Sequence, residues 1–177
     1  MLEFLLLLKT EDDRVAFQKI YEKSYRKLLY TAQGIIHNVH DAEEIVHDIY
    51  AKMADEYTYY SRFTVNQVIG IGVVMTRNAC INKIRFRQKY PESSFEDKEE
   101  FLGDGSNVLE DIVKDETMKE LATAYRRLNQ KDKDILALRY GYKMSYREIG
   151  KTLGMSDKTV DMRLYRAKRR LKGEFGH

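Results

Sequence analysis

The stretch from Met144 to Leu171 constrains the fold of this chain more than any other part of the sequence. Ser145 is followed three residues later by Glu148, and this capping box marks the start of a helix. Gly154 can take the left-handed conformation that ends such a helix. Three apolar residues then recur with the spacing of one buried helix face: Val160, Leu164 and Ala167. A short helix, a turn and a second helix predict a helix-turn-helix, whose second helix enters the major groove of DNA.

The polar side of this second helix is basic, and it supplies the residues that we expect to contact duplex DNA. Lysine and arginine hold phosphates regardless of sequence, whereas arginine also reads the edge of guanine. The candidate contacts are Ser156, Lys158, Thr159, Arg163, Arg166 and Arg169. Lys158, Thr159, Arg163 and Arg166 are the candidates for reading bases. Arg169 is interpreted as a phosphate contact or as a solvated surface charge.

Charge is strongly segregated along the chain, although the net charge of the 177 residues is only +3. Residues 1–91 carry a net charge of +2, residues 92–120 a net charge of −8, and residues 121–177 a net charge of +9. The acidic stretch contains the turn signal Asp104-Gly105 and lacks a sustained hydrophobic period, which is typical of a flexible linker. We therefore predict two small helical domains, residues 1–91 and 113–177, joined by an acidic flexible linker over residues 92–112.

The first domain is predicted to be entirely helical. A short apolar helix is expected over residues 2–9, and a long amphipathic helix begins near Val15, where apolar residues recur at spacings of three and four. Asp41 is expected to cap a further helix with an exposed acidic face. Gly70 and Gly72 weaken the prediction of a helix at the start of residues 67–90. Together with the helix-turn-helix, this pattern predicts an all-α fold.

Aromatic and basic residues between positions 57 and 90 suggest contact with unpaired bases. A polar connection over residues 57–66 contains Tyr59, Tyr60, Arg62 and Phe63, and aromatic rings beside arginine suit base stacking. For any single ring, closing the adjacent core is at least as good an interpretation. The helix that follows carries amide and guanidinium groups that suit base edges and phosphates: Arg77, Asn78, Asn82 and Arg85.

No residue pattern indicates a catalytic centre, a cofactor or a metal site. The sequence lacks nucleotide-binding glycine motifs and a nucleophile elbow. Glu44 and His47 have the spacing of a metal-binding helix, but a second such pair is missing. The single cysteine, Cys80, lies on an apolar helix face and allows no intrachain disulfide, which fits a cytoplasmic protein. The longest apolar run, near Leu5–Leu8, is far too short to span a bilayer, and we expect neither a signal peptide nor membrane insertion.

Three segments in a fixed order resemble the bacterial sigma factors of the sigma-70 family, in the small extracytoplasmic-function (ECF) group. The first resemblance covers the long amphipathic helix and the signature D-A-E-E-I-V-H-D at Asp41–Asp48. The second is TRNACINKIRFRQK, which resembles the end of the family's region 2. The third runs from Leu138 to Leu171 and resembles region 4. The similarity covers residues 15–90 and 121–172.

This resemblance implies a role for each segment. Region 2 in the family binds the β′ clamp helices of core RNA polymerase, here through Asp41, Glu43, Glu44, Ile45 and Asp48. It also opens the minus-ten promoter element, here through Tyr59, Tyr60, Arg62, Phe63, Arg77, Asn78, Asn82 and Arg85. Region 4 binds the minus-thirty-five duplex, which assigns it the six candidate contacts of the second helix, and the β flap. The resemblance also implies a cognate anti-sigma factor and a linker that runs through the polymerase.

The chain departs from the family pattern at several positions, and two other functions stay open. There is no tryptophan, Asn82 stands where aspartate is usual, and His47 where glutamine is usual. These differences bear on which promoter is read. The first alternative is a phage-type or LuxR-like regulator that binds DNA without polymerase, although such a protein needs no acidic clamp-binding helix. The second is a protein-interaction bundle, against which the net charge of +9 over residues 121–177 argues.

Overall fold

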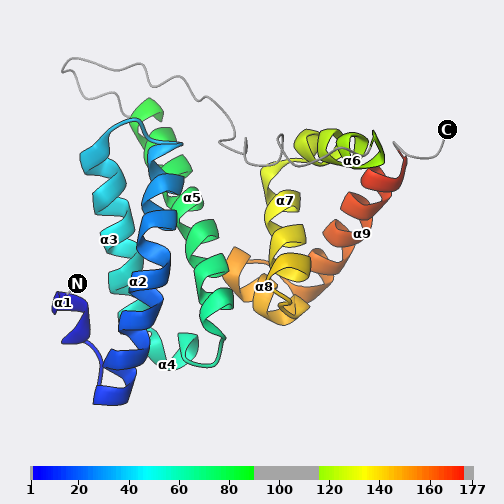
Figure 1. Ribbon diagram of the computed structural model, residues 1–177. Coiled ribbons are helices and arrows are strands. Elements are labelled where there is room, and N and C mark those ends of the chain that lie inside the picture. The colour runs from blue at the N-terminus through cyan, green and yellow to red at the C-terminus, as the bar shows by residue number, and fades with distance from the viewer. Residues whose placement is uncertain (1, 90–115, 174–177) are drawn as a thin grey trace. The chain divides into compact units, whose positions relative to one another are not determined.

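A computed structural model of the protein describes residues 2–89 and 116–173 (Figure 1). All regular structure in these residues is helical, so the predicted all-α fold is confirmed for them. The chain divides into two compact units, Met1–Gly105 and Ser106–His177. The predicted linker over residues 92–112 and both predicted domain boundaries lie outside the described residues, and they stay predictions.

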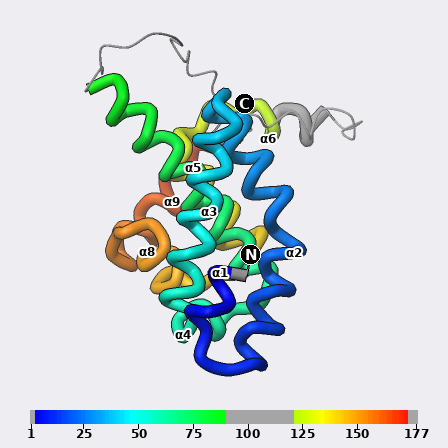
Figure 2. Tube along the Cα trace, turned by 90° about the vertical axis from the view of Figure 1, so that its left-hand side faces the viewer, coloured from blue at the N-terminus to red at the C-terminus, as the bar shows by residue number. Residues whose placement is uncertain are grey.

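Three long helices form the core of the first unit: α2 (Glu11–Gln33), α3 (Val39–Asp55) and α5 (Val65–Lys89). Their apolar stripes meet at side chains that are almost completely buried, among them Leu28, Tyr50, Met53 and Ile71. The short α1 (Leu2–Leu5) packs against α2 and α3 (Figures 1 and 2), and it places Phe4 in this core. The one-turn α4 (Tyr57–Tyr60) connects α3 to α5.

Two helix starts differ from the sequence prediction because side chains upstream cap them. Helix α2 begins at Glu11 rather than near Val15, since the side chain of Thr10 accepts a hydrogen bond from the backbone of Asp13 at 3.1 Å. Helix α3 begins at Val39, and its cap is Asn38 rather than Asp41. Both starts precede the first buried apolar residue, so hydrophobic period alone places them too late.

The glycines near the start of α5 do not interrupt the helix, which runs without a break from Val65. A Cβ atom on Gly72 would lie 3.1 Å from the Cε of Met53 and 3.2 Å from a Cδ of Leu28. Gly72 therefore lets α5 approach α2 and α3 closely. The packing gained by this approach offsets the intrinsic helix cost of glycine.

The second unit contains the predicted helix-turn-helix. Helix α6 (Glu116–Arg127) leads to α7 (Gln130–Leu136), which continues as the π-helical segment η2 (Ala137–Gly141). Helices α8 (Tyr146–Leu153) and α9 (Asp157–Gly173) follow and pack on each other. The capping box of Ser145 and Glu148 is present, and Gly154 ends α8 with a φ of 65°.

The buried stripe of α9 is also confirmed, because Val160, Leu164 and Ala167 are at most 1% exposed. Ile149 of α8 is also fully buried, and α8 packs on α9 in the core of the second unit. Gly150, next to Ile149, determines how tightly the turn folds back on α8. The carbonyl oxygen of Gly150 accepts a hydrogen bond from the backbone of Met155, and a Cβ atom on this glycine would lie 2.5 Å from the carbonyl oxygen of Met155.

We predict that Gly150→Val destabilises the second unit by about 1–3 kcal/mol, because a β-branched side chain forces the turn away from α8. Chemical denaturation followed by circular dichroism measures this loss. Gly141→Ala is the matched control, since a Cβ atom there meets nothing within 4 Å. Equal stability of Gly150→Val and the control would contradict the predicted clash.

Candidate nucleic-acid and protein interfaces

Helix α9 presents most of the predicted duplex contacts to solvent. Lys158, Thr159, Arg166 and Arg169 are exposed, whereas Arg163 is half-buried. Ser156 caps the helix, because its Oγ accepts a hydrogen bond from the backbone of Thr159 at 3.2 Å. The two hydroxyls of Ser156 and Thr159 are also hydrogen-bonded to each other at 2.8 Å. The start of α9 is thereby ordered before any ligand binds.

Arg163 is held by a carboxylate that the sequence analysis did not identify. Its guanidinium lies 2.9 Å from the carboxylate of Asp132 on α7, whose side chain is only 5% exposed. Arg170 approaches the same carboxylate at 3.5 Å, and the amide of Asn129 donates to it at 2.6 Å. In the sequence, Asp132 is marked only by the helix cap that Asn129 forms. No neighbouring residue connects Asp132 to α9, where Arg163 follows more than 30 residues later.

A cleft of about 410 Å³ lies between the start of α7 and α9, beside this ion pair. Its polar walls include Thr159, Arg163, Arg166 and Arg170. Guanidinium groups that are fixed around a cleft suit phosphate oxygens and guanine edges, because their planar fork donates two parallel hydrogen bonds. The pairing with Asp132 occupies only part of the five donors of Arg163, so this residue remains a candidate reader.

On α5, three of the four predicted strand-opening residues share one exposed face. Asn78, Asn82 and Arg85 recur at spacings of four and three and are exposed, whereas Arg77 is half-buried on the neighbouring face. Phe86 lies beside this face and is 65% exposed, although the sequence analysis did not assign it a role. The sequence signal for Phe86 was its position outside the apolar stripe of α5, which passes through Ile84.

The predicted aromatic loop is only partly available for base contacts. Tyr60 is 4% exposed, and its hydroxyl donates to the sulfur of Met75 at 3.6 Å, so its ring is not on the surface here and a base contact by Tyr60 stays a prediction. The reason is the helical turn α4, which directs Tyr60 into the core. Burial raises the pKa of Tyr60 to about 12. Tyr59 and Phe63 are half-buried with ring centroids 5.1 Å apart, and Arg62 is exposed.

The acidic face of α3 is smaller than predicted. Asp41 is 6% and Ile45 is 5% exposed, so neither lies on an exposed surface as the prediction of polymerase contacts requires. Asp41 faces α5, where its carboxylate lies 2.9 Å from the Nζ of Lys83 and 2.7 Å from the guanidinium of Arg87. Of the five predicted polymerase contacts on α3, three are exposed, namely Glu43, Glu44 and Asp48. Glu44 also pairs with Lys83.

Nothing in residues 2–89 and 116–173 points to a resident metal or to membrane insertion. Within these residues no three histidine, cysteine, aspartate or glutamate side chains come together as ligands for one ion. Among the same residues, none of the helices combines the length and hydropathy that crossing a membrane requires. Cys80 is buried, as expected from its place on the apolar face of α5.

The surroundings of Asp41 predict a specific pH dependence of folding. Burial raises the pKa of Asp41, but hydrogen bonds and charge from Arg87 and Lys83 outweigh it and leave the pKa below its ordinary value. A carboxyl whose pKa is lower in the folded state stabilises the fold above its unfolded pKa of about 4. This contribution disappears as the pH falls through the pKa of the folded state.

We predict that Asp41→Asn destabilises the first unit by about 1–2 kcal/mol at neutral pH, less than for a fully buried pair because Lys83 and Arg87 reach solvent. The difference from the wild type is expected to shrink as the pH falls below about 4, and to vanish once the pH is below the lowered pKa of Asp41 in the folded state. Urea denaturation at a series of pH values measures both effects. Asp48→Asn, on the exposed face of the same helix, is the control, and a pH-independent difference for Asp41→Asn would contradict the assignment.

Comparison with known proteins places the helix-turn-helix in a family. Residues 118–171 match the family described as sigma-70, region 4. No curated protein matches the sequence. Among solved structures, the sigma factor RpoE in complex with the anti-sigma factor NepR from Bartonella quintana is similar to this chain, at 16% identity over 90% of this chain and 96% of that chain, with a TM-score of 0.47. Residues 118–171, which include the helix-turn-helix of the second unit, are thus similar to sigma-70 region 4.

Proposed function

We propose that this protein is a sigma factor of the ECF group, which directs core RNA polymerase to specific promoters and helps to open the minus-ten element. The observation that carries the proposal is the sigma-70 region 4 at residues 118–171, in a chain whose other unit presents an acidic helix face and a separate polar stripe. The proposed role is transcription regulation in the cytoplasm rather than catalysis. It requires no cofactor.

In this proposal α9 binds the major groove of the minus-thirty-five duplex. Lys158, Arg163 and Arg166 are the proposed contacts to base edges and phosphates, and the cap formed by Ser156 and Thr159 orders the start of the helix. Arg169 lies further along the exposed side, where it is placed to hold phosphate. The same unit is proposed to bind the β flap, as the resemblance to region 4 implies.

The first unit is proposed to open the minus-ten element with the exposed stripe of α5. Asn78 and Asn82 offer amide donors and acceptors for base edges, and Arg85 offers a charge for the backbone. The half-buried rings of Tyr59 and Phe63, with Arg62 beside them, supply a surface for unstacked bases. Arg77 is proposed to support the stripe from the neighbouring face of the helix.

Core polymerase is the proposed partner of α3. The exposed carboxylates of Glu43, Glu44 and Asp48 form a surface that suits the basic residues of a clamp helix. Buried Asp41 and Ile45 support this surface from below instead of touching the partner. A cognate anti-sigma factor is a further proposed partner, because covering these surfaces would prevent assembly with polymerase.

Binding to core polymerase separates this proposal from a regulator that acts on DNA alone. We predict that the purified chain retains bacterial core RNA polymerase in a pull-down and supports run-off transcription from a subset of a promoter library. Asp48→Arg is expected to weaken retention at least tenfold, because it places a like charge opposite a basic partner. Lys52→Glu, at the end of the same helix, is a charge-change control. DNA binding without retention of core polymerase would favour the LuxR-like alternative.

For promoter DNA, we predict that Arg163→Ala and Arg166→Ala each weaken binding to the selected promoter by about 1–3 kcal/mol if the residue reads a base. Fluorescence anisotropy with the specific and a scrambled duplex, over a series of salt concentrations, measures both affinities. Arg169→Ala is the comparison, and it is expected to weaken both duplexes alike and to lower the salt slope by about 0.9. Equal losses on both duplexes for Arg163→Ala would assign Arg163 to the phosphate contacts.

Arg163→Ala also removes a partner of buried Asp132, so its folding must be compared separately. A thermal unfolding curve for each variant serves this purpose. Arg166 has no such partner among the described residues, and its variant therefore tests the groove contact with the least disturbance of the fold.

A further inference from the structure

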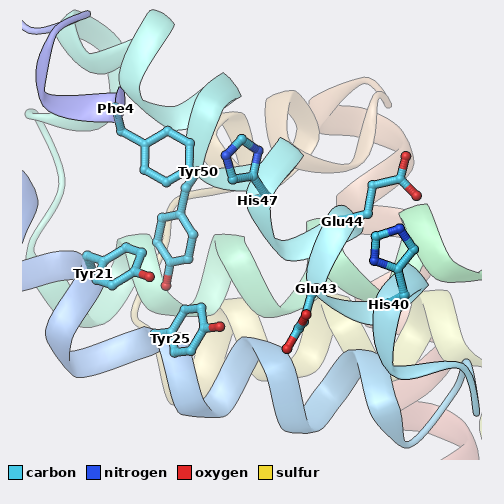
Figure 3. Close-up of a pocket in the computed structure, with 8 residues that line it drawn as sticks. All are labelled: Phe4, Tyr21, Tyr25, His40, Glu43, Glu44, His47 and Tyr50. Carbon is cyan, nitrogen blue, oxygen red and sulfur yellow. The ribbon is translucent and has the colours of Figure 1, made fainter. Parts of the chain in front are cut away.

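A cleft of about 430 Å³ lies on the first unit between α1, α2 and α3 (Figure 3). Side chains from all three helices line it, chiefly Phe4, Tyr21, Tyr25, Glu43, His47 and Tyr50. Its walls are therefore mostly aromatic, and they also include the exposed carboxylates of Glu43 and Glu44 and the ring of His40. Neither the DNA-binding stripe of α5 nor the helix-turn-helix contributes to it.

The aromatic walls are held in place before any partner binds. The rings of Tyr21 and Tyr25 stack with centroids 5.1 Å apart and planes inclined by 25°, and the ring of Tyr21 lies 4.7 Å from that of Tyr50. The hydroxyl of Tyr50 is fixed by a hydrogen bond of 2.6 Å to Ser24. Phe4 closes the other end, with its ring centroid 4.7 Å from that of His47. A preformed wall of this kind reduces the entropy lost on binding.

These rings present neutral π-faces at physiological pH. Burial raises the pKa of Tyr21, and it raises the pKa of Tyr50 to about 12. A neutral tyrosine ring carries partial negative charge on its face and attracts an ammonium or guanidinium group. The rings of the cleft thus attract a cation in addition to the carboxylates that line it.

Glu43 supplies a full negative charge beside these rings. Figure 3 shows its side chain extending from α3 towards α2, near Tyr25. Glu44, one residue later, is already paired with Lys83, whereas no cation among the described residues pairs with Glu43. An exposed carboxylate next to stacked tyrosines is the arrangement that a lysine or arginine side chain fills with both an ion pair and ring contact.

We propose that this cleft is a socket for one basic side chain of core RNA polymerase, which packs against the tyrosine rings and pairs with Glu43. The socket rests on the proposed function and deepens it. Glu44 of α3 also lines the cleft, and Asp48 follows on the same exposed side of that helix, so a partner that covers this acidic face also covers the cleft. Phe4 of α1 becomes part of the polymerase-binding surface in this arrangement, by supporting the far wall.

The test compares two variants of the full chain for affinity to bacterial core RNA polymerase. Tyr25→Leu keeps the apolar volume but removes the π-face, and Glu43→Gln keeps the shape but removes the charge. Each is expected to weaken binding about fivefold, and Tyr25→Phe is expected to bind within about twofold of the wild type because the ring face remains. The double variant is expected to lose less than the product of the single losses, since both groups hold one side chain.

Controls on the same elements distinguish the socket from general effects. Tyr30→Leu removes an exposed ring elsewhere on α2, and Glu22→Gln removes an exposed charge, and both are expected to bind like the wild type. Thermal unfolding of every variant identifies any that fail to fold. Wild-type affinity for both Tyr25→Leu and Glu43→Gln, while Asp48→Arg still weakens binding, would overturn the socket and leave the proposed function standing. Absence of binding by the wild type would overturn both.

Discussion

In each unit, one buried carboxylate that is paired with basic side chains of another helix determines how the helices are held. Asp41 of α3 pairs with Lys83 and Arg87 of α5, and Asp132 of α7 pairs with Arg163 of α9. Apolar stripes drive the helices together, but the hydrophobic effect has no direction. A carboxylate out of water is costly unless it is paired, so these contacts penalise any shift of one helix along another. The ion pairs thus fix the position of one helix along the other, which apolar contacts alone would not fix.

The same pairs determine which charges remain for a partner. On α3, Asp41 turns inward and Glu44 shares Lys83, so Glu43 and Asp48 make up most of the unpaired acidic surface that the proposed polymerase contact needs. Asp132 of α7 holds one side of the Arg163 guanidinium on α9. This pairing limits the directions in which the remaining donors of Arg163 point. An arginine that is oriented in advance loses less entropy when it meets a base edge than one that is free to rotate. The ion pairs that hold the helices therefore also determine which charged groups are available to a partner.

Local features of the fold were predictable from sequence, and contacts between distant residues were not. The capping box of Ser145 and Glu148 and the left-handed Gly154 depend only on near neighbours, so their residue types suffice to predict them. Asp41 looked like an exposed acidic residue because Lys83 and Arg87, which bury it, lie more than 40 positions away. Tyr60 looked like part of a polar loop, since only the turn of α4 directs it towards Met75. Asp132 and the tyrosine cleft were missed because each combines side chains of separate helices.

In the proposed function, the distribution of charge also implies that the two units hold promoter DNA by different means. The first unit has a net charge of +2 over residues 1–91, and two of its cations, Lys83 and Arg87, are paired with α3. The net positive charge of this unit is small, while the stripe of α5 offers the amides of Asn78 and Asn82, and α4 and its surroundings offer rings. Such groups recognise bases rather than backbone, and bases are reachable from all sides only after the strands separate. Residues 121–177, with a net charge of +9, supply the salt-dependent attraction to duplex DNA. In the proposed function, the second unit therefore provides most of the affinity for the closed promoter, and the first unit gains its contacts only as the promoter opens.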